Sequence, residues 1–203
     1  PDMLTDGRDL MLAVAAGTPG AFERLVAVYE PRVKAAVARS IRDRSSVEDL
    51  AQEVFLRLYR ARERYRPTAK FETYLYRIIF NICVNHTQYM ARRRSLSLDV
   101  AADDEGRAAL APADEKEPRP LEALEASERA VQVRRAIEGL PDTQRRALVL
   151  SRFEGLGYEE IAEVMGISLQ AVKSLLWRAR DNVRQRLSPI LGEGRGDKGT
   201  RDG

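Results

Sequence analysis

A strip of hydrogen-bond donors follows a short turn in the last quarter of the chain. Its members are Gln170, Lys173, Ser174, Trp177 and Arg178, and intervals of three and four residues place them on one side of a helix. An amide, an ammonium, a hydroxyl, an indole N–H and a guanidinium can all donate hydrogen bonds. The strip is therefore suited to the phosphates and base edges of a major groove.

Two short helices between Tyr158 and Arg180 must hold this strip. Apolar residues at helical spacing predict one shared buried face, made of Ile161, Ala162, Met165, Ile167, Val172 and Leu176. Gly166 tolerates a positive φ at the turn, and Ser168 is a natural N-cap for the second helix. The pattern predicts a helix-turn-helix, and an ordinary helical hairpin is the alternative.

Another helix is predicted from Val47, because the residues from Ser45 to Glu48 have the pattern of a capping box. Its inward stripe consists of Leu50, Val54 and Leu58. Its other side gathers Asp49, Gln52, Glu53 and Leu56, at i, i+3, i+4 and i+7. A solvated acidic face is the alternative, but an exposed leucine among carboxylates favours a protein docking surface.

The next predicted helix covers residues 71–94 and has a second informative polar strip. It buries Leu75, Ile78, Ile79 and Ile82, and it leaves exposed Tyr74, Arg77, Asn81, Asn85, Gln88 and Arg92. The preceding loop, from Tyr65 to Phe71, interleaves aromatic rings with cations such as Lys70. Rings stack on unpaired bases while cations follow phosphates, which favours binding of single-stranded nucleic acid. Core aromatics beside a solvated basic helix end are an equal alternative.

Composition excludes several kinds of site. Net charge is only +3, from 34 basic and 31 acidic residues. The segregation of charge along the chain therefore indicates more about binding partners than the net charge does. The single cysteine, Cys83, and the single histidine, His86, exclude a disulfide framework, a multi-cysteine metal site and a histidine-based catalytic triad. The acid pair Glu159-Glu160 diverges by about 100° on a helix, so an enzyme is the least favoured class. We expect no metal and no cofactor.

The chain divides into two helical blocks, residues 8–94 and 121–188, with almost nothing that reads as strand. Residues 95–120 carry seven acidic and three basic residues, three prolines and no apolar stripe, which is typical of a linker. The glycine-rich tail after Leu187 is expected to be disordered. Since no apolar run approaches the roughly 20 residues of a membrane span and no signal pattern begins the chain, we expect a soluble, cytoplasmic protein.

Three segments in this order resemble the bacterial sigma factors of RNA polymerase, specifically the small two-domain extracytoplasmic-function group. DLAQEVFLRLYR (49–60) is similar to the family segment that docks on the polymerase clamp helices. Residues 71–94 resemble the helix that melts and reads the minus-10 element, and residues 140–180 resemble the domain that reads the minus-35 element.

The resemblance implies an all-α fold of two helical domains. Sigma region 2 would occupy residues 8–94, an acidic flexible linker 95–127, sigma region 4 residues 128–188, and a disordered tail 189–203. A linker of about 30 residues spans up to roughly 100 Å when extended. Promoter elements separated by about 17 base pairs lie about 60 Å apart, so this linker would reach.

The resemblance also assigns residues by position. Polymerase binding would fall on Asp49, Gln52, Glu53 and Leu56, the same face that the helical spacing singles out. The minus-10 strand would be read by Tyr65, Lys70, Phe71, Tyr74, Arg77, Asn81 and Asn85. The minus-35 duplex would be read by Gln170, Lys173, Ser174, Trp177 and Arg178, with Arg145 and Arg146 near backbone phosphates.

Two residues depart from the family pattern. Tyr74 stands where many members have tryptophan, which keeps an aromatic ring but reduces its stacking area. Leu175 stands where many members have a basic residue, so one phosphate or base contact is missing. The promoter sequence therefore does not follow from the resemblance.

The function implied is promoter-specific transcription initiation without catalysis. Core RNA polymerase, promoter DNA in duplex and single-stranded form, and an anti-sigma factor would be the partners. A two-domain helix-turn-helix regulator is the first competitor, but it predicts an upstream α/β receiver, and the first block has no strands. A helical scaffold or adaptor protein is the second competitor.

Overall fold

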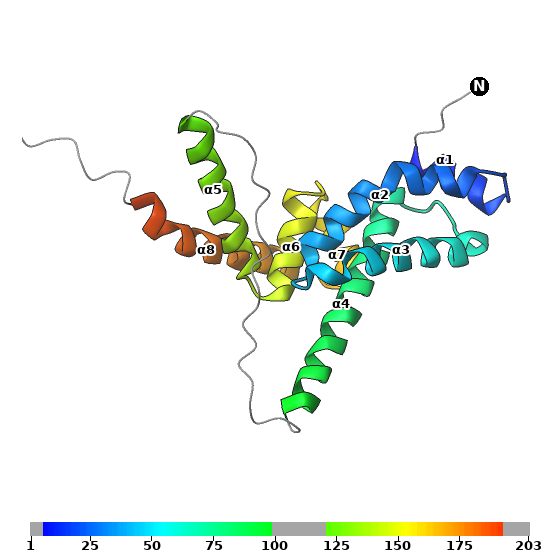
Figure 1. The fold of residues 1–203 in the computed structure, drawn as a ribbon. Helices are drawn as coiled ribbons and strands as arrows, with labels where there is room; N and C mark the ends of the chain where they lie inside the picture. Colours follow the sequence, from blue (N-terminus) through cyan, green and yellow to red (C-terminus); the bar gives the residue numbers. More distant parts are fainter. Residues whose placement is uncertain (1–5, 99–120, 193–203) are drawn as a thin grey trace, which may run out of the picture.

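The computed structural model describes residues 6–98 and 121–192, with side chains described in 6–95 and 130–188. All regular structure within these ranges is helical, as predicted. Figure 1 shows the elements in order: α1 (Gly7–Ala15), α2 (Ala21–Ser40), η1 (Arg44–Ser46), α3 (Val47–Ala61), η2 (Arg62–Arg64), α4 (Phe71–Leu98), α5 (Leu121–Glu138), α6 (Asp142–Arg152), α7 (Tyr158–Met165) and α8 (Leu169–Gly192). None of the described helices is long and apolar enough to cross a membrane.

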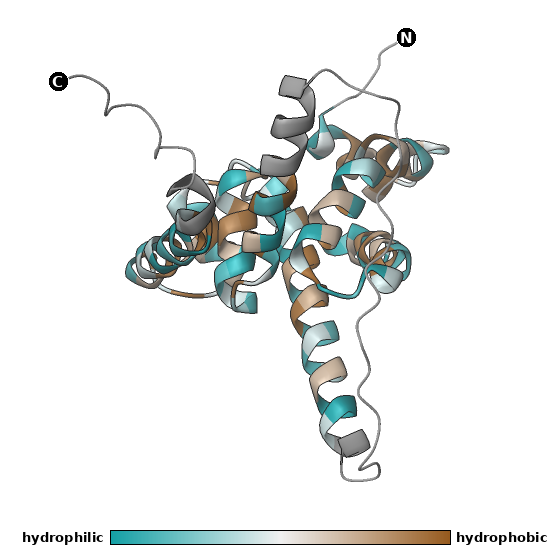
Figure 2. Ribbon diagram, turned by 60° about the vertical axis from the view of Figure 1, so that its left-hand side comes forward, coloured by the Kyte–Doolittle hydropathy of each residue, from teal (hydrophilic) through white to brown (hydrophobic). Residues whose placement is uncertain are grey.

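Helices α1 to α4 form the first domain around a shared apolar core. Its buried side chains include Leu10, Leu25, Val33, Val54, Leu58, Leu75 and Ile79. Burial of each such side chain contributes roughly 1.5–3 kcal/mol. The core lies at the N-terminal half of α4, while the other half of that helix projects beyond the body of the molecule (Figures 1 and 2).

The start of α3 differs from the predicted capping box. The side chain of Ser46, at the N-cap position, makes no capping hydrogen bond. Instead Asp43 caps a short 3-10 turn: its carboxylate accepts from the backbone N–H of Ser45 at 3.0 Å and from the Ser46 hydroxyl at 2.6 Å. The Ser45 hydroxyl also donates to this carboxylate, at 2.6 Å, and the hydrogen bonds from the Ser45 hydroxyl, the Ser46 hydroxyl and the Ser45 backbone to the charged form lower the pKa of Asp43. A carboxylate two residues ahead of the predicted box therefore does the capping.

Helices α5 to α8 form the second domain, which contains the predicted helix-turn-helix. Gly166 has φ 65° and ends α7 in the left-handed region, as the turn requires. The Ser168 hydroxyl accepts from the backbone N–H of Ala171 at 3.2 Å, so the predicted cap is present. Ile161, Val172 and Leu176 are buried together, and this confirms their expected place in a shared core.

Three element boundaries differ from those expected. Helix α4 continues to Leu98 and α5 begins at Leu121, so both ends of the predicted linker, 95–127, are helical. Helix α8 continues through Pro189 to Gly192, so the first four residues of the predicted tail, 189–203, belong to a helix. The remainder of the linker and of the tail lies outside the described residues.

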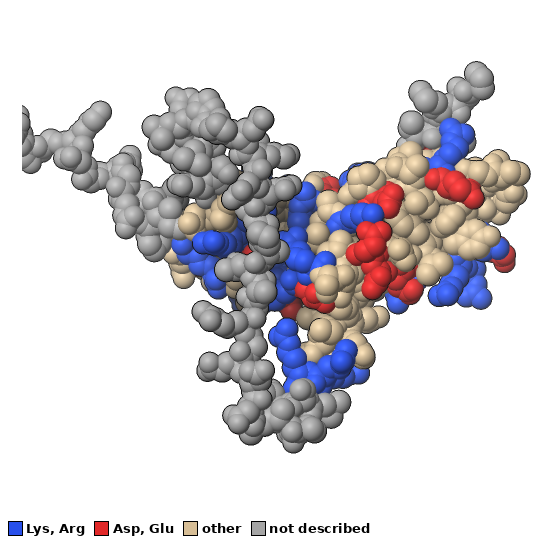
Figure 3. Space-filling model, in the orientation of Figure 1, with Lys and Arg blue, Asp and Glu red and all other residues tan. Residues whose placement is uncertain are grey.

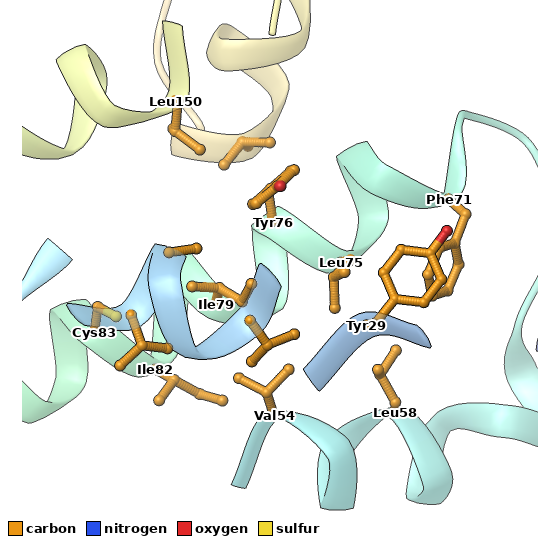
Figure 4. Close-up of a cluster of buried hydrophobic side chains, with 14 of the residues drawn as sticks. Tyr29, Val54, Leu58, Phe71, Leu75, Tyr76, Ile79, Ile82, Cys83 and Leu150 are labelled. Atoms are coloured by element: carbon orange, nitrogen blue, oxygen red, sulfur yellow. The ribbon is translucent and has the colours of Figure 1, made fainter. Parts of the chain in front are cut away.

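The two domains pack directly against each other. Helix α7 lies along α4, and α6 lies against α2. One apolar cluster extends from Val54 on α3 through Tyr76 on α4 to Leu150 on α6 (Figure 4). The apolar segments of both halves meet in the middle of the molecule (Figure 2). The sequence predicted two domains separated by a linker. In this structure the two domains are in direct contact.

Gly7 marks the tightest approach in the first domain and gives a stability prediction. A Cβ there would lie 2.2 Å from Phe71 Cδ1 and 2.2 Å from the Tyr29 hydroxyl oxygen. We expect Gly7→Ala to lower the free energy of unfolding by about 1–3 kcal/mol, because a well-packed core resists added volume. Urea unfolding followed by circular dichroism measures this. Gly157→Ala, where the nearest atom lies 3.5 Å away, is the matched control, and equal losses in both variants would contradict the prediction.

Candidate docking and nucleic-acid interfaces

The predicted docking face on α3 is exposed. Asp49, Gln52 and Leu56 all reach solvent, and 48% of Leu56 is accessible. Glu53 is half-buried and accepts from Arg57 Nε at 2.8 Å. The structure thus brings together the four residues that spacing placed on one side of a helix.

A groove of about 320 Å³ runs beside this face, between α2 and α3. Its apolar lining comes from Phe22, Val26, Ala51, Phe55 and Leu56, and its rim from Glu30, Lys34, Glu48 and Gln52. Acidic side chains gather over these helices (Figure 3). An apolar groove with a polar rim can accommodate the side chains of a partner helix.

Most of the aromatic side chains near the start of α4 that were predicted to stack on bases are buried in the structure. Tyr65 and Phe71 are 5% and 2% exposed, and their ring centroids lie 6.4 Å apart, edge to face. The half-buried ring of Tyr74 lies 5.3 Å from that of Tyr65. For Tyr65 and Phe71 the alternative of core aromatics holds in this structure, and these rings position the loop rather than present a face to a base.

The polar strip of α4 is more open. Asn81 and Asn85 are exposed, and so is Arg77, whose guanidinium lies 5.9 Å from the centroid of the Tyr74 ring. Further along, Lys and Arg side chains cluster at the projecting end of α4 (Figure 3), where the sequence has Arg92, Arg93 and Arg94. The amide side chains of α4 can contact the bases of a nucleic-acid strand, and the arginines at the end of the helix can contact the phosphates of the same strand.

The donor strip of the helix-turn-helix faces solvent on α8. Gln170, Lys173, Trp177 and Arg178 are exposed, with Trp177 66% accessible, and Ser174 is half-buried. A large indole left open to solvent between cations is typical of a recognition surface rather than of a core. Leu175, which departs from the family pattern, packs against the core and supports the helix from behind.

Arg145 and Arg146, which we expected near backbone phosphates, point into the first domain instead. Arg145 is 1% exposed; its Nη2 donates to the Ser40 carbonyl at 3.0 Å and to Asp142 at 2.9 Å. Arg146 is 6% exposed; its Nη2 donates to the Cys83 carbonyl at 3.2 Å and to Thr87 at 2.5 Å. Burial lowers the pKa of both guanidinium groups. Neither can reach DNA in this arrangement.

Sequence reasoning missed the residues that join the domains, above all Glu154. Its side chain is only 3% exposed and lies 3.4 Å from Arg39 Nη1 and 3.8 Å from Arg32 Nε. It also accepts a hydrogen bond from Tyr76, and burial together with this bond raises the pKa of the tyrosine. Glu154 lies in a loop without periodicity, so no local pattern marks it.

Both helical domains match protein-family models. Residues 25–94 match sigma-70 region 2, and residues 122–183 match sigma-70 region 4. The two matches cover the α2–α4 and α5–α8 helices that carry the surfaces described above.

Curated relatives agree over nearly the whole chain. The RNA polymerase sigma-H factor of Pseudomonas aeruginosa is 37% identical over 197 residues, covering 94% of this chain and 100% of the relative. The ECF RNA polymerase sigma-E factor of Escherichia coli K12 is 33% identical over 190 residues, covering 94% and 98%. That of Haemophilus influenzae is 31% identical, with 94% and 99% covered.

Solved structures share the fold. CnrH in complex with the cytosolic domain of CnrY superposes with a TM-score of 0.61 at 22% identity, over 90% of this chain and 97% of that one. The sigma factor RpoE of Bartonella quintana, in complex with the anti-sigma factor NepR, gives 0.63 at 20%, over 83% and 98%. The family models and the curated relatives together show that this chain belongs to the sigma-70 family of RNA polymerase sigma factors, in its extracytoplasmic-function group.

Proposed function

We propose that this sigma factor divides promoter recognition among three surfaces. The α3 face of Asp49, Gln52, Glu53 and Leu56 binds the clamp helices of core polymerase. The α4 strip of Arg77, Asn81 and Asn85, with Lys70 and Tyr74 beside it, holds the melted minus-10 strand. The α8 strip of Gln170, Lys173, Ser174, Trp177 and Arg178 reads the minus-35 duplex.

The exposed α8 strip is the observation that carries this proposal. Its side chains are donors, face outward and sit on the second helix of a helix-turn-helix, the helix that enters a major groove in this class of fold. Phosphate contacts from such side chains position the protein, and base-edge contacts specify the sequence.

The factor acts without catalysis and without a cofactor, in the cytoplasm where polymerase is. An anti-sigma factor is a further partner: the sigma factor RpoE of B. quintana was solved with its anti-sigma factor NepR. The groove between α2 and α3 is a surface that such a partner would compete for.

Transcription with purified components tests the proposal. We expect core polymerase and a supercoiled promoter library to give promoter-specific transcripts only when this chain is added. Mapping of the start sites would then reveal both elements and their spacing. Equal transcription without the chain would refute its role as a sigma factor.

A narrower prediction concerns the minus-10 strand. Asn81→Ala together with Asn85→Ala should shorten the lifetime of the open complex by about tenfold or more, since each lost hydrogen bond between a side-chain amide and a base costs about 0.5–1.5 kcal/mol. Permanganate reactivity of unpaired thymines after a competitor challenge measures the lifetime. Glu23→Ala, an exposed change on α2, is the control. An unchanged lifetime in the double variant would place the strand elsewhere.

A further inference from the structure

A cavity of about 250 Å³ lies where three helices meet, apart from the surfaces of the proposed function. Its walls come from the loop after α2, the second half of α4 and the first turn of α6. Each of these segments contributes one arginine: Arg42, Arg94 and Arg145. Basic side chains also gather beside α6 in Figure 3. None of the lining residues belongs to the three surfaces assigned to polymerase or to DNA.

Arg145 brings a positive charge into the wall of this cavity and keeps unused donors there. Its Nη2 donates to the Ser40 carbonyl and to Asp142, whereas its Nε and Nη1 have no hydrogen-bond partner among the described residues. Arg42 Nε lies 3.4 Å from the same Asp142 oxygen. One carboxylate therefore serves two guanidinium groups, and a buried cation that lacks acceptors is costly.

The second carboxylate of the cavity, Asp43, is occupied by its own loop. It accepts from the backbone N–H of Ser45 and from the hydroxyls of Ser45 and Ser46. His86 Nε2 lies 3.9 Å from Asp43, beyond hydrogen-bond distance, and no described residue is its partner. With His86 neutral, three arginines against two aspartates leave one positive charge in the cavity.

The remaining two arginines are open to a ligand. The Arg42 side chain is 59% exposed, and the exposed Arg94 guanidinium forms no hydrogen bond or ion pair within the part of the chain that the structure describes. Guanidinium groups suit phosphate, which offers three acceptor oxygens and up to two negative charges. Ile41 and Met90 add an apolar wall, which suits the uncharged part of a larger ligand.

We propose that this cavity binds a small phosphate, either inorganic phosphate or the phosphate group of a nucleotide. Arg42 and Arg94 donate to the phosphate oxygens from the entrance. Arg145 adds positive charge from the wall, where a low local dielectric strengthens the attraction. A DNA duplex cannot enter a cavity of this size, so the ligand is a small molecule. This site is a fourth one, beyond the three surfaces of the proposed function.

His86 makes occupancy of the site measurable, because it is the only histidine of the chain and it lines the cavity. We expect titration of the untagged full chain with inorganic phosphate, at constant pH, to shift the NMR signals of the His86 imidazole until they saturate. Sodium chloride at equal ionic strength controls for screening and should give no saturable shift.

A parallel titration with adenosine monophosphate distinguishes the two sources of the phosphate. Tighter binding than inorganic phosphate would assign the site to nucleotides, and equal or weaker binding would assign it to free phosphate. The absence of a saturable shift with both ligands would overturn the proposal.

Arg94→Ala locates the binding in the cavity. It should raise the Kd for the ligand about tenfold, the effect of losing one hydrogen bond to a charged group. Arg92→Ala removes the same charge from an exposed position of the same helix outside the cavity, and this matched control should leave Kd within about twofold. An unchanged Kd in Arg94→Ala would show that the ligand binds elsewhere.

Arg145→Met tests the buried cation, since it removes the charge but keeps most of the side-chain volume. We expect the saturable shift of His86 to disappear. Circular dichroism and urea unfolding establish whether this variant folds, because Arg145 also donates to Ser40 and Asp142. A folded Arg145→Met chain with wild-type affinity would contradict the proposal. If the variant does not fold, the comparison of Arg94→Ala with Arg92→Ala decides.

Discussion

The triple replacement of Asp49, Gln52 and Leu56 by alanine should abolish capture of core polymerase. The change removes a carboxylate, an amide and the apolar centre of one exposed face, beside a groove lined by Phe22 and Phe55. A few residues at the centre of an interface commonly contribute 2 kcal/mol or more each, so we expect Kd to rise about 100-fold or more. Competition with a labelled sigma factor for core polymerase measures this.

The fold should survive the triple replacement, since these side chains lie outside the core. Circular dichroism and unfolding by urea check that it does. Arg60→Ala, exposed near the end of the same helix, is the matched control and should leave Kd within about twofold, as surface changes outside a hot spot usually do. A triple variant that still competed fully would show that the docking face lies elsewhere.

Lys173→Ala with Arg178→Ala should lower use of promoters that depend on the minus-35 element by about 100-fold. Each side chain that contacts a base edge contributes roughly 1–3 kcal/mol, and each lost phosphate contact reduces the salt dependence of binding. Both side chains are exposed on α8, so their removal leaves no cavity. Runoff transcription from promoters with and without a minus-35 element measures the difference.

The control for this prediction removes the same charge from another helix of the second domain. Arg134→Ala with Arg135→Ala changes two exposed residues of α5 and should have little effect on the ratio between the two promoters. Core binding should be unchanged in both double variants. If core binding fell together with promoter use, the division of tasks between the two domains would be wrong.

Local elements could be predicted because their signals are local. The apolar periodicity of α3 and the glycine at the turn before α8 each depend on residues within one or two helical turns, and the structure confirms them. The cap by Asp43 was missed because several carboxyls and hydroxyls precede α3, and only the backbone path selects among them.

The contact between domains could not be predicted in the same way. Arg145 and Arg146 look like surface cations in the sequence, and only the approach of Ser40 and Cys83 makes them buried donors. Tyr65 and Phe71 illustrate the same limit, because an aromatic ring fits either a core or a stacking surface until the tertiary structure decides. Contacts between polar groups that are far apart in the sequence produce no periodic pattern from which they could be predicted.

The buried carboxylate of Glu154 has a consequence for the exchange of domains between sigma factors. Its side chain is 3% exposed and lies close to Arg32 and Arg39 of the first domain. A second domain with a different residue at this position would leave those two cations without this carboxylate. Chimeras that are meant to keep this contact therefore have to carry Arg32, Arg39 and Glu154 together.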